Sequence, residues 1–196
     1  MRGVPRWGVV SSAASPVLLI GGWTIAAVLQ PPSFNPVADT ISALAAIGAT
    51  DRWVMTLVLL AVGVCDTVTG AALRPAAPAG RLILIAGAVA GTLVAAYPEH
   101  AGSGSVPHAI WASLGFAGLA GWPAGAWRRG PPVPWGLQPA VCFGAVAVQL
   151  VLLAWFVAEL VTGAGQAGLA ERVVAAAQAI WPLAVVLSCR ATAAFT

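Results

Sequence analysis

Residues 137–161, LQPAVCFGAVAVQLVLLAWFVAELV, decide the fold, because Glu159 is the one charged residue in a long apolar run. Roughly 20 apolar residues suffice for a helix to cross the hydrocarbon core of a bilayer. Comparable runs recur along the rest of the chain. The sequence therefore predicts transmembrane helices near residues 13–30, 53–73, 82–97, 107–127, 137–161 and 171–190.

The overall composition agrees with a membrane protein. Of the 196 residues, 60% are hydrophobic and 8% are charged, whereas a soluble domain carries about 25% charged residues. Six spans of roughly 20 residues leave only short connections. We therefore predict an all-α polytopic protein, with residues 1–196 forming one transmembrane domain in which six helices make a single bundle.

The arginines predict the orientation of this bundle. All nine basic residues are arginine, and with both termini cytoplasmic only Arg52 and Arg172 lie outside. The other seven lie inside: Arg2, Arg6, Arg74, Arg81, Arg128, Arg129 and Arg190. The positive-inside rule therefore predicts a multi-pass protein of the cell membrane with both termini cytoplasmic. The basic charge forms an inner collar, so we expect membrane lipid and no nucleic acid as a partner.

The first outer connection, near residues 31–50, predicts a short amphipathic helix. Asn35 is a suitable N-cap, Pro36 suits the first helical position, and Gly48 is suited to end the segment. One apolar stripe is formed by Val37, Ile41, Leu44 and Gly48. We expect this helix to lie at the outer interface or to dip into it.

Two carboxyls within or next to apolar spans stand out. A charge in hydrocarbon is costly, so we expect Asp66 to be neutral or hydrogen-bonded, through Thr69 or Gln149, unless it marks a polar cavity. Glu171 is expected at a helix N-terminus, where the macrodipole favours an anion and Arg172 can neutralise it. A structural role is the favoured interpretation of Glu171.

The outer ends of the predicted helices bring acids and a histidine together. Glu99 follows one helix and His108 begins the next, while the amphipathic segment carries Asp39 and residues 137–161 carry Glu159. A carboxyl among apolar and aromatic side chains favours its protonated form and can donate a proton. We predict that Asp39, Glu99, His108 and Glu159 line one outward-facing pocket as catalytic residues.

Polar and aromatic side chains near this surface are the predicted substrate contacts. Gln149, Phe156 and Glu159 share one helix face, and Glu171, Gln178 and Trp181 share another. The predicted substrate-binding residues are Ser42, His100, Trp111, Gln149, Trp155, Phe156, Gln178 and Trp181. The two histidines have no HxxxH or HExxH spacing, so we expect neither a metal nor another cofactor.

The order of these features resembles the DUF998 family of small six-helix integral membrane proteins. The segments that carry the resemblance are residues 38–44 (ADTISAL) with Gly48, residues 97–100 (YPEH), His108, and residues 168–172 (GLAER). The resemblance spans nearly the whole chain. It implies a six-helix bundle and does not imply an activity.

Two classes of function remain open. One is an intramembrane enzyme, a lyase or isomerase, that acts on a lipid-soluble substrate, for example an isoprenoid, by general acid/base chemistry. The small membrane terpene cyclases are a compositional analogy for this class. The other is a non-enzymatic membrane binder, transporter subunit or assembly partner. A cavity open to lipid favours the enzyme, and a tightly packed bundle favours the binder. The sequence sets neither the substrate nor the oligomeric state.

Overall fold

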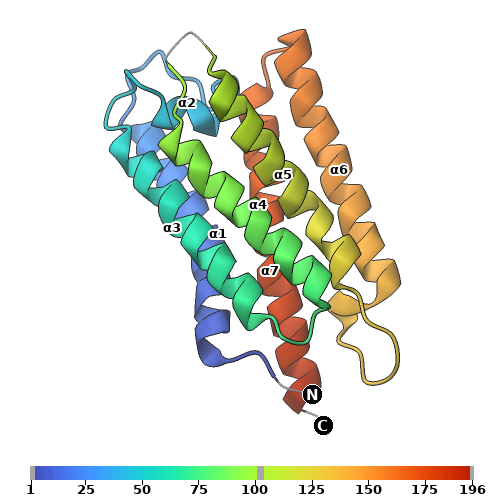
Figure 1. The fold of residues 1–196 in the computed structure, drawn as a ribbon. Coiled ribbons are helices and arrows are strands. Elements are labelled where there is room, and N and C mark those ends of the chain that lie inside the picture. Colours follow the sequence, from blue (N-terminus) through green and yellow to red (C-terminus); the bar gives the residue numbers. More distant parts are fainter. Residues whose placement is uncertain (1–2, 101–103, 195–196) are drawn as a thin grey trace.

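The computed structural model describes residues 3–100 and 104–194, which form six long α-helices and two short helical segments (Figure 1). The long helices are α1 (Arg6–Val28), α3 (Trp53–Ala72), α4 (Pro78–Ala96), α5 (Val106–Ala126), α6 (Pro139–Thr162) and α7 (Ala167–Ala194). The short segments are α2 (Ile41–Ala45) and the 3-10 turn η1 (Trp135–Leu137). The predicted all-α fold is confirmed.

The long helices run up and down in one bundle, with the N- and C-terminal ends of the chain at the same end (Figure 1). Helices α1, α3, α4 and α5 pack in chain order, and α7 contacts both α1 and α6. Helix α6 packs between α5 and α7 and leaves most of its surface exposed. The other long helices therefore form the packed part of the bundle, and α6 lies at one side with much of its surface exposed.

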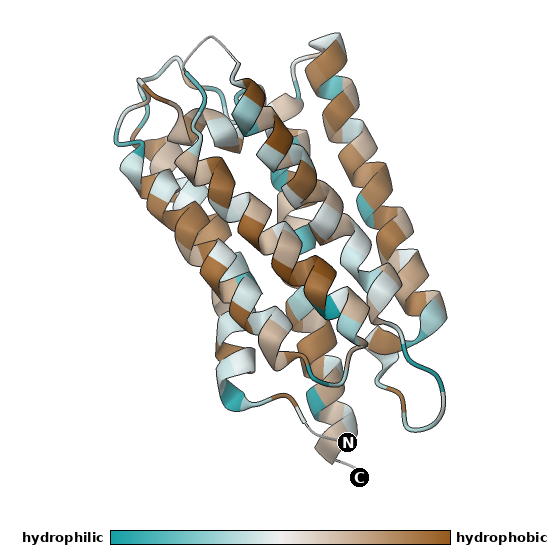
Figure 2. Cartoon of the chain, viewed as in Figure 1, coloured by the Kyte–Doolittle hydropathy of each residue, from teal (hydrophilic) through white to brown (hydrophobic). Residues whose placement is uncertain are grey.

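Five of these helices, α1, α3, α4, α6 and α7, are long and apolar enough to cross a membrane. Hydrophobic residues recur along these helices (Figure 2), and many of their exposed side chains are large and hydrophobic. This supports a multi-pass membrane protein. Helix α5 lies where the fourth span is predicted, but it is not among these five helices. Six spans therefore stay a prediction.

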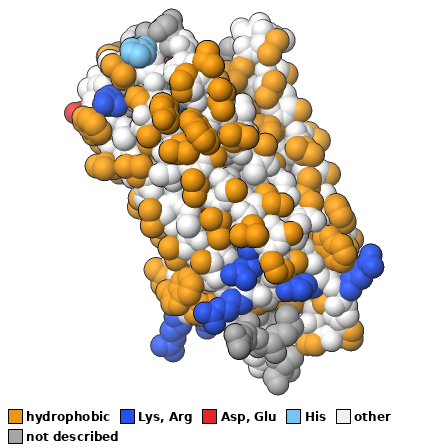
Figure 3. Space-filling view, viewed as in Figure 1, with side chains coloured by type: hydrophobic (Ala, Val, Ile, Leu, Met, Phe, Trp, Pro, Cys, Tyr) orange, Lys and Arg blue, Asp and Glu red, His pale blue; other side chains and the backbone are white. Residues whose placement is uncertain are grey.

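Apart from Asp66 within α3, the charged residue types lie at the two ends of the bundle, with arginines gathered at the end that holds the termini (Figure 3). Among the described residues this arginine-rich end carries Arg6, Arg74, Arg81, Arg128, Arg129 and Arg190, and the opposite end carries Asp39, Asp51, Arg52, Glu99, Glu159, Glu171 and Arg172. Arg2 lies outside the described residues. We call the opposite end the outer end, and its orientation in the cell remains a prediction.

Three helices are longer than predicted, and one of them, α4, begins at Pro78 instead of residue 82. Helix α1 begins at Arg6 instead of residue 13, because Ser11 and Ser12 donate their hydroxyl hydrogens to carbonyls one turn earlier and so fit inside the helix. Helix α7 begins at Ala167 instead of residue 171. Glu171 consequently lies in the second turn, and the prediction that it occupies the helix N-terminus is wrong.

The short helix in the first outer connection is present, but its start was predicted wrongly. Thr40 caps α2, since its hydroxyl accepts the Ala43 N–H at 3.1 Å. The Asn35 carboxamide instead accepts the Val37 N–H at 3.0 Å in a tight turn. Leu44 is completely buried. Helix α2 therefore inserts into the outer end of the bundle instead of lying flat on it.

Helices α4 and α5 approach each other through glycines. A Cβ atom on Gly118 would lie 2.8 Å from the Gly87 Cα, and one on Gly87 would lie 2.9 Å from the Leu119 nitrogen. Small residues permit such backbone contact between membrane helices. Gly87 therefore lies in close contact with α5, whereas a Cβ on Gly91, one turn later in α4, would meet no heavy atom within 4 Å.

We predict that Gly118→Ala destabilises the bundle by roughly 1–3 kcal/mol, because the added methyl overpacks a backbone contact. The control is Gly121→Ala on the same helix, where a Cβ meets nothing within 4 Å; it should change stability by no more than about 1 kcal/mol. Thermal unfolding of both variants in detergent measures the difference. Equal stability of the two would contradict the close packing of α4 and α5.

The topology predicts which connections can be labelled from outside the cell. Most of the predicted outer loop, residues 101–105, lies outside the described residues, so we choose Ala164, which is exposed between α6 and α7. In a chain without its native cysteines, a membrane-impermeant maleimide should label Ala164→Cys and leave Gln138→Cys, between α5 and α6, unlabelled until the membrane is opened. Equal labelling of both in intact cells would exclude a model with six spans.

Candidate functional site

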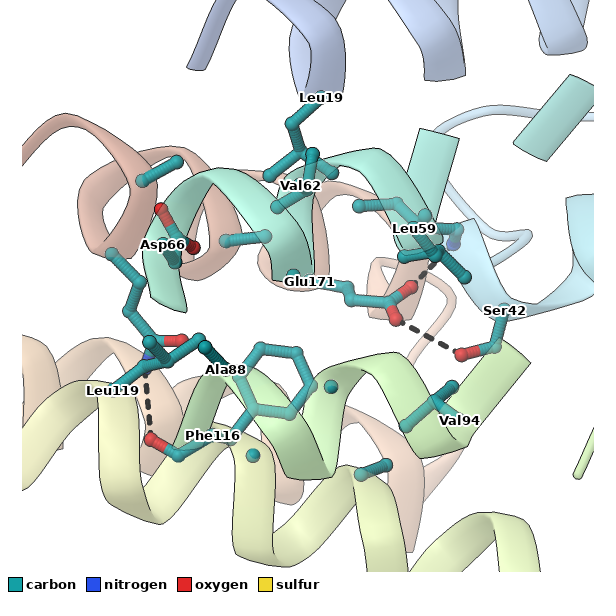
Figure 4. Close-up of a pocket in the computed structure, with 18 residues that line it drawn as sticks. Leu19, Ser42, Leu59, Val62, Asp66, Ala88, Val94, Phe116, Leu119 and Glu171 are labelled. Carbon is teal, nitrogen blue, oxygen red and sulfur yellow. Dashed lines mark hydrogen bonds between the residues drawn. The ribbon is translucent and has the colours of Figure 1, made fainter. Parts of the chain in front are cut away.

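A cavity of about 110 Å³ lies among α3, α4, α5 and α7, and we call it the core cavity (Figure 4). Its wall is almost entirely apolar, with Leu59, Val62 and Leu119 among the lining residues. Its polar lining residues are Ser42, Asp66, Glu171 and Gln178. A site for one water needs only about 10–15 Å³ of cavity volume, so the core cavity has room for several waters or a small ligand.

A second hollow of about 360 Å³ lies between α5 and α6, and we call it the lateral pocket. Its lining includes the exposed residues Ala109 and Ser113 of α5 and Val157 and Leu160 of α6. The lateral pocket therefore opens on the side of the bundle, where lipid would lie. Ser42, Ala112, Phe116 and Glu171 line both hollows, so the two meet at these residues.

A chain of hydrogen-bonding groups occupies this junction. The buried Glu171 carboxyl accepts the Ile41 N–H, and its Oε1 lies 3.3 Å from the Ser42 hydroxyl (Figure 4). The Ser42 Oγ lies 3.1 Å from Nε2 of His108, and Nδ1 of His108 lies 3.1 Å from the Tyr97 carbonyl oxygen. A carbonyl only accepts, so the hydrogen-bond network assigns a hydrogen to Nδ1.

This relay, Glu171–Ser42–His108, can hold one mobile proton in two ways. With Glu171 protonated, the carboxyl donates to Ser42 and Ser42 donates to Nε2 of His108. With the proton on His108, Nε2 donates to Ser42 and Ser42 donates to the Glu171 carboxylate. Both arrangements satisfy the donors and acceptors of the three side chains. The proton can therefore pass between the carboxyl and the imidazole through a serine hydroxyl, with little movement of heavier atoms.

Local structure fixes each member of the relay. Thr40 caps α2 and thereby orients Ser42 in its first turn, while the Ser105 hydroxyl accepts the His108 N–H at 3.5 Å near the start of α5. Backbone hydrogen bonds from Gly168 and Leu169 to the carbonyls of residues 38 and 37, at 3.1 and 2.9 Å, tie the start of α7 to the chain before α2. A Cβ on Gly168 would collide with the Asp39 carbonyl.

Arg172 strengthens this junction, but it forms no direct ion pair with Glu171 such as the sequence suggested. Its Nη1 donates to the carbonyls of Pro36, Asp39 and Gly168 at 2.7, 2.8 and 2.9 Å. The guanidinium satisfies backbone carbonyls that α2 and α7 leave open. Glu171 consequently remains inside the bundle with hydrogen-bond donors and without a cation as its direct partner among the described residues.

The predicted convergence of four catalytic residues holds for two of them. Glu99 and His108 both line the lateral pocket. Asp39 instead accepts the Asn35 N–H at 2.7 Å and lines a surface hollow that it shares with Glu99 but not with His108 or Glu159. Glu159 accepts the Gln166 N–H at 2.9 Å, away from both the lateral pocket and the core cavity. These two carboxylates lie outside the lateral pocket because they accept hydrogen bonds from backbone N–H groups of the connections, which would otherwise lack partners.

Three of the predicted substrate contacts line the two hollows. Ser42 and Phe156 line the lateral pocket, and the Phe156 ring centroid lies 5.5 Å from that of Phe116. Gln178 lines the core cavity and donates to the Phe116 carbonyl at 3.0 Å. On α7, Glu171 and Gln178 of the predicted helix face line the core cavity, whereas Trp181 of the same face does not.

The other five predicted contacts lie elsewhere. His100 is exposed, Trp111 stacks on Tyr97 at 6.5 Å, and the Trp155 indole donates to Glu159 at 3.3 Å. Trp181 packs against Trp135 at 6.0 Å near the arginine-rich end. Gln149 is buried, and neither its amide oxygen nor its amide nitrogen has a partner among the described residues. These positions are explained by contacts between aromatic side chains and by the direction in which each helix face points. The sequence pattern predicts neither.

Glu171 is the residue that sequence analysis assigned to a structural role and that the structure places at the centre of the site. The sequence signal for a place in the site was that Glu171 shares a helix face with Gln178. Because the helix was expected to start at residue 171, the carboxyl was instead assigned to the helix N-terminus. A helix start at Ala167 would have placed it among apolar neighbours.

Asp66 occupies another part of the core cavity (Figure 4). It is 3% exposed, and its Oδ1 has no hydrogen-bond partner among the described residues. The predicted links to Thr69 and Gln149 are absent from this part of the chain, since the Thr69 hydroxyl lies 2.9 Å from that of Ser11. The neutral form of Asp66 remains a prediction, supported by its apolar surroundings.

No group of three or more His, Cys, Asp or Glu side chains in residues 3–100 and 104–194 is arranged to hold a metal ion. Glu171, Ser42 and His108 are the groups of the described site that are linked by hydrogen bonds and can exchange a proton. The apolar walls around it suit a substrate of low polarity.

Comparison with known families gives a match over residues 12–188 to a family described as "Protein of unknown function (DUF998)". The matched region contains Ser42, His108 and Glu171, and also Asp66. No match was found among curated proteins or among solved structures.

We expect Asp66→Asn to fold and assemble normally, with a loss of about 1 kcal/mol or less, because a neutral carboxyl and a carboxamide have similar size and polarity. Asp51→Asn, at the outer end, serves as the control for the same chemical change. Size-exclusion profiles and thermal unfolding in detergent measure the effect. If only the Asp66 variant failed to assemble, Asp66 would be charged and paired in the folded protein.

Proposed function

The chain belongs to the DUF998 family, and we propose that it is an intramembrane enzyme that performs general acid/base chemistry on a lipid-soluble substrate. The observation that carries this proposal is the buried relay of Glu171, Ser42 and His108, located where the core cavity meets the lateral pocket. Helix packing alone requires no such chain of proton-transfer groups beside an opening toward lipid.

Each relay member has a distinct role in this proposal. Glu171 is the general acid, because its carboxyl faces both hollows and begins the hydrogen-bonded chain to Ser42 and His108. Ser42 passes the proton between the carboxyl and the imidazole. His108 is the second acid/base group, held in one orientation by the Tyr97 carbonyl. No external cofactor is needed for a reaction that only moves protons.

Isomerisation of a branched alkene, such as an isoprenoid, is the reaction class that fits best. Glu171 would transfer its proton to one alkene carbon, forming a C–H bond and a carbocation at the other carbon. Loss of a proton from a neighbouring carbon to the relay would then form a new double bond and restore the starting protonation. The Phe116 and Phe156 rings line the lateral pocket and can stabilise the developing positive charge.

A non-enzymatic role in binding or transport is the second candidate, and one observation favours it. Asp66 adds a second buried carboxyl to the core cavity, and its Oδ1 lacks a partner among the described residues. Two carboxyls in one cavity suit a bound cation or a proton pathway as well as catalysis. This alternative predicts that the membrane lipids themselves remain chemically unchanged.

Solvent deuterium provides the test of the enzyme. Membranes that contain the wild-type chain should incorporate deuterium from D₂O into an apolar lipid, detected by mass spectrometry of the extracted lipids. Glu171→Gln should reduce this incorporation by about 10²-fold or more, the usual contribution of a general acid. Ser42→Ala should also reduce it, because the relay is interrupted.

Glu159→Gln is the matched control, since it neutralises a carboxyl at the same end of the bundle that lies outside both hollows. It should retain the wild-type rate. Incorporation that is identical in wild type and Glu171→Gln would refute the enzyme proposal, and so would its absence from all membranes. Comparable amounts of folded protein are checked by size-exclusion chromatography.

A further inference from the structure

A hollow at the arginine-rich end is unrelated to the relay and is independent of the proposed function. We call it the arginine pocket. It has a volume of about 720 Å³ and is lined by Arg74, Pro75, Arg81, Arg128, Arg129, Gly130, Pro131, Pro132 and Val133. Four of its nine lining residues are thus arginines, and none is acidic. These arginines belong to the basic patch visible in Figure 3.

Two of the four arginines are fixed by backbone carbonyls. Arg81 donates from Nε and Nη2 to the carbonyls of Gly70 and Ala71, at 3.0 and 2.9 Å, in the last turn of α3. Arg128 donates in the same way to the carbonyls of Pro75 and Ala76, at 3.1 and 3.2 Å. These bonds hold two cations at the rim of the pocket and leave part of each guanidinium uncommitted.

The other two arginines are available to a ligand. The side chains of Arg74 and Arg129 are exposed and donate no hydrogen bond to another described residue, although Arg129 lies 4.9 Å from the centre of the Trp127 ring. Four like charges around one hollow repel each other. An anion between them would remove this repulsion and supply acceptors for the free N–H groups.

We propose that the arginine pocket binds the phosphate group of an anionic amphiphile. Guanidinium groups match phosphate oxygens in planar, two-pronged hydrogen bonds, which ammonium groups do not reproduce. The pocket is formed by the connections that follow α3 and α5 and by the start of α4, at the end of the apolar helices, where a lipid headgroup would lie beside the bundle. Its turn-forming residues, Gly130 to Pro132, restrict the backbone that carries two of the arginines.

The competing explanation is that these arginines only contribute to the positive charge that orients membrane proteins. The chain offers a matched control for this explanation. Arg6 and Arg190 lie at the same end of the bundle, are exposed, and do not line the pocket. Removing them takes away the same total charge as removing Arg74 and Arg129. A diffuse charge effect would be equal in the two cases, whereas a binding site would not.

The experiment compares wild type, Arg74→Gln/Arg129→Gln and Arg6→Gln/Arg190→Gln, all purified as the full chain in detergent. Binding of dioleoyl-phosphatidylglycerol is measured by native mass spectrometry during titration. Inorganic phosphate is tested separately through its effect on the thermal unfolding midpoint. We expect the pocket variant to bind the phospholipid at least about tenfold more weakly than the control variant.

The two probes distinguish the source of the phosphate. A pocket-specific loss of phospholipid binding indicates a lipid headgroup, and a pocket-specific loss of stabilisation by inorganic phosphate indicates a free phosphate; either result supports the site. Equal losses in both double variants, or no loss in either probe, would overturn it. If the pocket variant does not fold, Arg129→Gln against Arg6→Gln gives the same comparison, because Arg129 donates no hydrogen bond to another described residue.

Discussion

Inside a bilayer a carboxyl has no water to bond, and Glu171 obtains its partners from a segment about 130 residues earlier in the chain. The Ile41 N–H and the Ser42 hydroxyl both point at it. Helix α2 must therefore enter the bundle, and the start of α7 must lie against the chain that precedes α2. Gly168 and Arg172 meet these requirements, one by lacking a side chain and the other by satisfying three carbonyls.

The same constraint gives the outer end its chemistry. Because Ser42 is held between Glu171 and His108, three groups that each need a partner become one hydrogen-bonded chain. This chain borders an apolar cavity and a pocket that opens between α5 and α6. A satisfied polar network in an apolar interior also limits how α2, α5 and α7 can move, since breaking it would leave several polar groups unpaired.

Charged side chains have different hydrogen-bond partners at the two ends of the bundle. At the outer end, acids and arginines are bound to backbone groups of the connections, as Glu159 and Arg172 show. At the arginine-rich end, Arg81 and Arg128 use backbone carbonyls while Arg74 and Arg129 remain without described hydrogen-bond partners. At the outer end, Glu159 and Arg172 are therefore hydrogen-bonded within the protein, whereas at the arginine-rich end Arg74 and Arg129 remain exposed to their surroundings.

The sequence by itself determined where the long helices lie, how charge divides between the ends, and that Glu99 and His108 share a pocket, because run length and short connections are local properties. Only the tertiary structure decided that Glu171 meets Ser42 and His108, that α2 is buried, and that Asp39 and Glu159 turn to backbone N–H groups. A polar side chain chooses its partner among all groups that packing brings within about 3 Å, and periodicity along one helix does not encode those distant neighbours.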